Sequence, residues 1–219
     1  MFFVSIAIQF KYKSQHDGTG LSTKLIFASA PKMRLLQILS ALCVLIGPLL
    51  SHANDDFLSE DYTPVIKNNL LHQNLQLVFK TNFALACNPY HRIASWVMFS
   101  LTQKDLDKTP RYKRITGSYS TDSELTGACQ VANSEYSEYT KHGYDRGHLA
   151  DAESFNGTSI GNQEVAVTSN MTPQDLSFNR GIWAKLEAWQ RDQAENEKHI
   201  VVFVGPVLDQ KLPALKAGI

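Results

Sequence analysis

The segment that spans residues 144–150, YDRGHLA, carries the strongest chemical signal in the sequence. His148 is a proton acceptor that titrates near neutral pH, and Arg146 is a permanent cation suited to phosphate. Gly147 between them predicts a turn in which the backbone stays open. Most histidines are ordinary core or surface residues, so this segment alone is a moderate indication of acid–base chemistry on an anion.

Four polar residues follow in a second block, at intervals of nine, eight and four positions: Asn170, Asn179, Glu187 and Arg191. The last three fall on the strongest predicted helix, residues 179–196. At about 100° per residue, they share one flank of that helix. Taken singly, an asparagine at a helix start is usually a cap, and Glu187 with Arg191 at i,i+4 is usually a surface pair.

The elements that must position these residues follow from the apolar pattern. The helix over residues 179–196 has an apolar stripe built from Trp183, Leu186 and Trp189. Residues 104–127 contain Pro110, Gly117 and many Ser and Thr, which predicts a loop. Alternation or short apolar runs predict strands over residues 74–83, 94–101, 164–168 and 200–204. Together these predict an α+β fold in a single domain.

The N-terminal part predicts a leader for export. Residues 33–53 begin with a basic Arg34, continue with an apolar stretch and end in small residues at Ser51 and Ala53, which is typical of a cleaved signal peptide. A membrane anchor is the alternative, but about 16 apolar residues fall short of the roughly 20 that span a bilayer. We expect Met33 to be the true start, residues 1–32 to be a misannotated upstream extension, and residues 54–219 to be the working domain.

Charge and cysteine content narrow the range of functions that the protein could have. From residue 54 onward there are 16 basic and 20 acidic residues, a net charge of −4, so a nucleic acid could be bound only by a local basic cluster. Cys43 lies in the expected leader, which leaves Cys87 and Cys129. In an exported chain two cysteines predict one disulfide, with a metal or nucleophilic role as the less favoured alternative.

The DRGH segment, followed 31 residues after its histidine by Asn179, resembles the DNA/RNA non-specific endonucleases, the family of the Serratia nuclease and mitochondrial endonuclease G. The resemblance extends from the strand region near residue 83 to Gly205-Pro206. It implies a mostly antiparallel sheet with a ββα-metal finger. It also implies that His148 is the general base that activates water, and that Asn179 is the direct protein ligand of Mg²⁺, with Mn²⁺ as an acceptable substitute.

The same resemblance assigns roles to the remaining polar residues. Asn170 orients the site, Glu187 holds metal-bound water, and Arg146 and Arg191 bind the phosphate. The family's upstream Arg-x-x-x-Phe-x-x-Asp pattern has its nearest counterpart in Arg114, although the phenylalanine is absent and the spacing differs. Arg111, Lys113 and Arg114 form either a local basic patch or a solvated loop. Zinc is disfavoured, because no Cys/His cluster could hold it.

We therefore expect an exported, Mg²⁺-dependent endonuclease that hydrolyses both DNA and RNA, located in the periplasm or outside the cell and free of the membrane after leader cleavage. Family members continue past Gly205-Pro206 with further strands, whereas this sequence stops at Ile219, so we expect a C-terminally truncated domain. Two alternatives stay open: a catalytically impaired nucleic-acid-binding remnant, and an exported disulfide-bonded protein with a structural or partner-binding role. The pattern leaves the oligomeric state undetermined.

Overall fold

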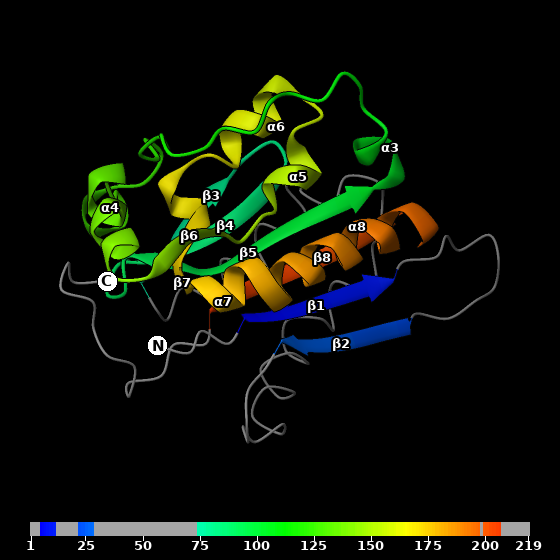
Figure 1. Ribbon diagram of the computed structural model, residues 1–219, viewed down its shortest axis with the longest axis horizontal. Helices are drawn as coiled ribbons and strands as arrows, with labels where there is room; N and C mark the ends of the chain where they lie inside the picture. The colour runs from blue at the N-terminus through cyan, green and yellow to red at the C-terminus, as the bar shows by residue number, and fades with distance from the viewer. Residues whose placement is uncertain (1–4, 12–21, 29–73, 198, 207–219) are drawn as a thin grey trace.

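The computed structural model describes residues 5–11, 22–28, 74–197 and 199–206. Within them, the larger sheet has the strand order β2-β1-β8-β5-β4-β3, and every neighbouring pair is antiparallel (Figure 1). Its strands are β1 (Ser5–Lys11), β2 (Ser22–Ala28), β3 (Gln76–Phe79), β4 (Phe83–Asn88), β5 (Ile93–Thr102) and β8 (His199–Pro206). A second, two-stranded antiparallel sheet pairs β6 (Tyr144–His148) with β7 (Met171–Asp175). The expected α+β class is confirmed.

The central strands β5 and β8 are apolar on both faces. Along β5, Val97 and Phe99 belong to the main core cluster, whereas Trp96 and Met98 belong to a second cluster. Because alternate residues of a strand point to opposite faces, burial on both sides requires a continuous apolar run. This explains why the predicted strands over 94–101 and 200–204 are confirmed, each lengthened by a few residues at its ends.

The helices cover one face of the larger sheet and link the two sheets. The last helical stretch runs continuously through α7 (Leu176–Phe178), a π-helical turn η7 (Asn179–Trp183) and α8 (Ala184–Glu197), and α8 lies across β8 and β5 (Figure 1). The others are α3 (Gln103–Leu106), η5 (Gly127–Cys129), α4 (Asn133–Lys141), α5 (Ala152–Phe155), α6 (Ser159–Glu164) and η6 (Thr168–Asn170). The predicted helix over 179–196 is confirmed, although it starts three residues earlier.

The start of this helix corrects the interpretation of Asn179 as a cap. The cap is Asp175, whose carboxylate accepts hydrogen bonds from the backbone N–H groups of Ser177 and Phe178 at 2.8 and 3.2 Å. Asn179 lies one turn inside the helix, where its side chain is available for other contacts.

Two predicted strands differ from the structure. Residues 74–83 form β3 and then turn before β4, because the Glu164 carboxylate accepts backbone hydrogen bonds from Thr81 and Asn82 at 2.8 and 3.2 Å. The predicted strand over 164–168 is wrong. Glu164 ends α6, Thr168 begins η6, and the only β pairing there in the described chain is an isolated bridge between Ser120 and Val167.

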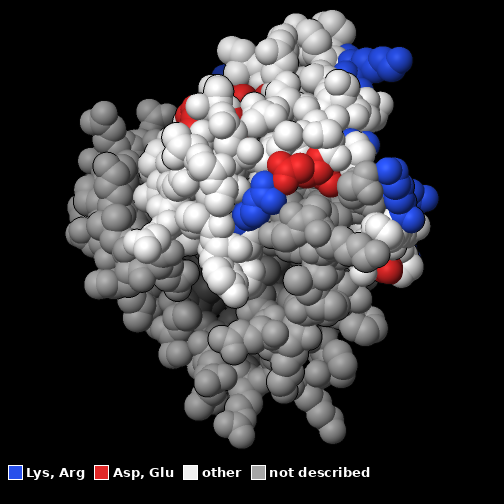
Figure 2. All heavy atoms as spheres, turned by 90° about the vertical axis from the view of Figure 1, so that its left-hand side faces the viewer, with Lys and Arg blue, Asp and Glu red and all other residues white. Residues whose placement is uncertain are grey.

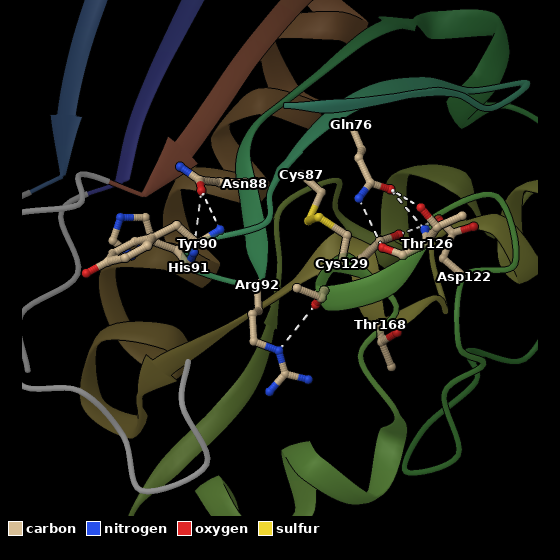
Figure 3. The surroundings of a disulfide bond; sticks show 12 residues. Gln76, Cys87, Asn88, Tyr90, His91, Arg92, Asp122, Thr126, Cys129 and Thr168 are labelled. Atoms are coloured by element: carbon tan, nitrogen blue, oxygen red, sulfur yellow. Dashed lines mark hydrogen bonds between the residues drawn. A yellow bond between two sulfur atoms is a disulfide. The ribbon is translucent and has the colours of Figure 1, made fainter. Parts of the chain in front are cut away.

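The predicted disulfide is confirmed and fastens the long loop to the sheet. Cys87 on β4 and Cys129 in η5 are bonded, with a sulfur–sulfur distance of 2.06 Å (Figure 3). Beside the bond, the side-chain amide of Gln76 accepts from the backbone N–H of Thr126 at 2.9 Å and donates to its carbonyl at 3.0 Å. The loop that precedes the DRGH segment is therefore held against the edge formed by β3 and β4.

The N-terminal strands occupy the other side of β8. β1 pairs with β8 along seven residue pairs, from Ser5 opposite Pro206 to Lys11 opposite Ile200. Both β1 and β2 precede Met33, so a protein that starts there would lack these two strands of the sheet. The expected leader, residues 33–53, lies outside the described residues. Within the described parts of the chain, no helix is long and apolar enough to cross a membrane.

Candidate active site

The DRGH segment forms a strand, not the expected turn. β6 pairs with β7 from Tyr144 opposite Asp175 to His148 opposite Met171. Gly147 has an ordinary negative φ, and the reason for glycine is close packing: an added Cβ would lie 2.1 Å from Cδ of Gln174, which is fully buried. The glycine therefore allows β7 to present a large polar side chain against the strand that carries the histidine.

The helix that follows β7 lies along β6 and completes a ββα unit. Asn179 contacts Asp145 near the start of β6, and the indole Nε1 of Trp183 donates to the carbonyl oxygen of His148 at 3.2 Å. Further along, Arg191 forms an ion pair with Asp151, three residues after the histidine. Successive helix positions 179, 183 and 191 thus contact successive positions 145, 148 and 151 on and just after β6. Asn179 and Arg191 lie on the flank that faces the DRGH segment, as the helical spacing predicts.

His148 is buried and lies beside the cation of Arg114. Its side chain is 4% exposed, its Nδ1 lies 3.5 Å from Nη2 of Arg114, and its ring meets that of Tyr119 edge-on with centroids 5.6 Å apart. Its Nε2 is buried and has no hydrogen-bond partner among the described residues. Burial lowers the pKa of His148 to about 4, and the charge of Arg114 acts in the same direction against the opposing effect of Asp151. The imidazole is therefore neutral at physiological pH.

Arg146 also contacts the Tyr119 ring. Its guanidinium carbon is 4.9 Å from the ring centroid, and its Nη1 donates to Oδ1 of Asn133 at 3.0 Å and to the carbonyl oxygen of Gly117 at 3.2 Å. Tyr119 thus contacts both the histidine and the arginine of the motif. Sequence reasoning did not identify this tyrosine as a site residue, because nothing in its spacing indicates contact with residues 146 and 148.

Asn170 holds the backbone just after the histidine. It is fully buried, its Oδ1 accepts from the N–H of Ala150 at 2.8 Å, and its Nδ2 donates to the carbonyl oxygens of Ala150 and Val165 at 3.0 Å each. One side chain therefore satisfies both backbone groups of a residue two positions from His148. Its removal would leave buried backbone groups unpaired.

Glu187 and Arg191 do not form the simple surface pair expected from their spacing. Arg191 donates to Asp151, which is 3% exposed and also caps α5 by accepting from the backbone N–H of Glu153 at 3.0 Å. Burial raises the pKa of Glu187 to about 8, the nearby negative charge of Asp151 adds to the rise, and Arg191 and Arg114 oppose it. Asp151 was missed by sequence reasoning, because an aspartate before a short helix indicates only a cap.

The donor atoms of the site fit a hard divalent cation. The Nδ2 of Asn179 is used by Asp145, so Oδ1 is the atom left for a ligand, and Glu187 adds a half-buried carboxylate further along the same helix. Oxygen donors suit Mg²⁺, which commonly keeps several of its waters. Among the described residues, no group of three His, Cys, Asp or Glu side chains could hold a metal ion, so they contain no tetrahedral zinc site of those ligands.

A strand pair that carries a buried histidine, followed by a helix with oxygen donors, forms a ββα unit within this α+β fold, and the family match assigns it to the nuclease class. The chain belongs to the DNA/RNA non-specific endonuclease family, which matches residues 61–218, and the resemblance drawn from its motifs is thereby confirmed. Proteins of this family hydrolyse phosphodiester bonds in nucleic acids and are in general metal-dependent.

Individual relatives agree with this membership. A nuclease from Syncephalastrum racemosum is 30% identical over 132 residues, which cover 60% of this chain and 40% of the relative. Nuclease C1 from Cunninghamella echinulata var. echinulata is 29% identical over 129 residues, or 58% of this chain and 50% of the relative. The crystal structure of the EndoG/EndoGI complex contains a chain with a TM-score of 0.55 and 27% identity, and the match covers 65% of this chain and 57% of that one. The matches thus span about half the length of these curated relatives.

Proposed function

We propose that this protein is an exported, Mg²⁺-dependent endonuclease that hydrolyses DNA and RNA without reading their sequence. The observation that carries the proposal is the contact between His148 and Arg114 at the end of β6, in a chain of the nuclease family. A neutral imidazole beside a permanent cation combines the two groups that phosphodiester hydrolysis requires, a base for water and a partner for the phosphate charge.

His148 acts as the general base in this proposal. As the water oxygen attacks phosphorus, its proton passes to the imidazole, and the bond between phosphorus and the leaving 3′ oxygen breaks while that oxygen takes up a proton from a second water molecule. The cations next to His148 bind the nonbridging oxygens, on which negative charge increases in the transition state. Arg114 lies 3.5 Å from the imidazole, and Arg146 contacts the Tyr119 ring, which also meets the imidazole. Asn170 orients the histidine by fixing the backbone at Ala150.

The cation would be held by Oδ1 of Asn179, with Glu187 accepting hydrogen bonds from its waters and Arg191 completing the phosphate contacts. When bound, Mg²⁺ would neutralise charge on the phosphate, and Mn²⁺ would serve in its place. The ion pair between Asp151 and Arg191 holds that arginine beside Glu187.

Any contact with the nucleic acid backbone would come from the arginines of the site rather than from a broad basic surface. On the described part of the face in Figure 2, acidic and basic side chains lie next to each other. Contacts to phosphate carry no sequence information. A site built from arginines next to one base would therefore cut DNA and RNA alike, and nothing in the sequence resembles a module that reads bases.

Export rests on the expected leader over residues 33–53 and on the disulfide, which forms in oxidising compartments. Cleavage after Ala53 would release residues 54–219 to the periplasm or the exterior. Intact mass spectrometry of the protein from its native host tests this directly. A product that begins at Asn54 supports the proposal, whereas one that retains residues 5–28 contradicts it.

The central test is degradation of plasmid DNA and of single-stranded RNA by the purified protein, with Mg²⁺ or with EDTA. We expect cleavage of both substrates, loss in EDTA, and a loss of about 100-fold or more in His148→Ala with DNA binding retained. Binding in EDTA without cleavage in Mg²⁺ would favour a binding remnant. If the folded protein neither binds nor cleaves nucleic acid, the result would indicate a structural or partner-binding role.

A further inference from the structure

Asp145 connects the proposed metal ligand to an arginine that has no role in the proposed mechanism. Oδ2 of Asp145 accepts from Nδ2 of Asn179 at 2.9 Å. Arg180 donates to both oxygens of the same carboxylate, from Nε to Oδ2 at 2.8 Å and from Nη2 to Oδ1 at 2.9 Å. Both carboxylate oxygens therefore accept hydrogen bonds from neighbouring side chains.

We propose that Arg180 is a positioning residue that locks the Asp145 carboxylate and, through it, orients the amide of Asn179 so that Oδ1 is presented to the cation. This inference rests on the proposed function, because it takes Asn179 as the ligand. It adds a residue that lies one position away from Asn179 and touches neither the substrate nor the cation.

The chemistry of an amide makes such a lock necessary. The two ends of an asparagine side chain have nearly the same shape, but only the oxygen can bind a cation, whereas only the nitrogen can donate a hydrogen bond. An ionised carboxylate only accepts, so Asp145 selects the NH₂ end of Asn179 and leaves Oδ1 on the other side. The selection holds only while the carboxylate itself stays in place.

Arg180 supplies that fixed geometry. A guanidinium binds a carboxylate through two parallel N–H donors, which sets both distance and plane, whereas a lysine ammonium acts as a point charge. The fork also covers both oxygens of Asp145, so the carboxylate is not free to displace Asn179 as the ligand. The π-helical turn that begins at Asn179 provides the local backbone from which two consecutive side chains reach one carboxylate.

The ion pair between Arg180 and Asp145 lies near the surface, so it can be changed by mutation without disturbing the core. The side chain of Arg180 is 69% exposed and that of Asp145 is 18% exposed, so the ion pair contributes little to the stability of the fold. Substitutions at Arg180 should therefore leave the protein folded, and a change in metal binding would report on orientation.

The test is Mn²⁺ binding to the full-length protein, measured by electron paramagnetic resonance of free Mn²⁺, without substrate. Arg180→Lys keeps the charge but loses the fork, and we expect it to weaken binding by about 10-fold. Arg180→Gln removes a positive charge near the cation, so simple electrostatics predicts tighter binding, whereas the proposal predicts weaker binding. Lys185→Gln, an exposed position on α8, is the control for the same change in charge.

Asn179→Ala distinguishes failure of the positioning role from failure of the ligand assignment. Thermal unfolding checks that each variant is folded. If Asn179→Ala weakens Mn²⁺ binding while both Arg180 variants bind as tightly as the wild type, the positioning role is wrong and the ligand assignment stands. If Asn179→Ala binds normally, both the inference and the ligand assignment are wrong. If the Arg180 variants lose affinity but the wild type cleaves no nucleic acid, the inference stands and the proposed function fails.

Discussion

Nη2 of Arg114 lies 3.5 Å from Nδ1 of His148. A guanidinium has only donors, so this contact favours the neutral tautomer in which Nδ1 carries no proton. The other ring nitrogen, Nε2, is buried without a partner among the described residues. In the favoured tautomer, the basic nitrogen of His148 faces the cation that would bind the scissile phosphate.

The first prediction concerns the pH dependence of cleavage. Because the pKa of His148 is lowered to about 4, the base stays unprotonated well below pH 6.5, and kcat/KM should fall only as pH approaches that lower value. Arg114→Gln removes one cause of the lowering, so the acidic limb should move to higher pH, whatever happens to the maximal rate. A limb at pH 6.5 in both proteins would contradict this explanation.

The second prediction concerns Glu187 and stability without metal. Its pKa is raised to about 8 in the folded protein, against an ordinary value of 4.5, so the folded state binds the proton more tightly. That contribution is complete below pH 4.5 and is lost as pH rises through 8. Glu187→Gln should therefore raise Tm in EDTA at pH 8.5 relative to the wild type, on the order of 2–4 °C, and change it less at pH 5. An equal effect at both pH values would show that ionisation of Glu187 is not the cause.

The third prediction concerns the glycine of the motif. Gly147→Ala places a methyl group against the buried Gln174 side chain, so we expect a loss of about 1–3 kcal/mol in the free energy of unfolding and reduced cleavage. Gly181→Ala is the matched control, because an added Cβ there meets no atom within 4 Å and the residue is helical. It should be neutral or slightly stabilising. Urea unfolding of both variants makes the comparison, and equal stabilities would contradict the packing explanation.

The fourth prediction concerns Tyr112 as a stacking surface for unpaired bases. Its side chain is 47% exposed two residues before Arg114, and its backbone N–H is anchored to the carbonyl oxygen of Asn156 at 2.7 Å. Stacking on an aromatic ring contributes about 1–3 kcal/mol per base, so Tyr112→Ala should raise KM for single-stranded substrate by roughly 10-fold, and Tyr112→Phe should not.

Tyr90 provides the control for Tyr112, since its side chain is 86% exposed in the turn between β4 and β5, near the disulfide (Figure 3). Tyr90→Ala should leave KM unchanged. Equal increases in the two alanine variants would argue against a specific role for Tyr112.

Local sequence patterns were sufficient for several elements. The strands β5 and β8 and the long helix were predictable, because burial on both faces of a strand and on one stripe of a helix leaves a regular pattern of apolar residues. The predicted strand over 164–168 failed for the converse reason. Its few apolar residues are buried between a short helix and a 3₁₀ turn instead. The backbone groups of Ala166 and Thr168 form hydrogen bonds with Ser120, which is far away in the sequence.

The sequence by itself determined the family, the histidine proposed as the general base and the pair of cysteines, because these depend on residue type and spacing alone. Only the tertiary structure decided that Gly147 serves close packing, that Asp151 takes Arg191 as its partner, and that Arg180 shares a carboxylate with Asn179. Each of these contacts joins residues about 30 or more positions apart. The energies of these contacts depend on distances between residues in the folded chain, and a local sequence pattern does not determine those distances.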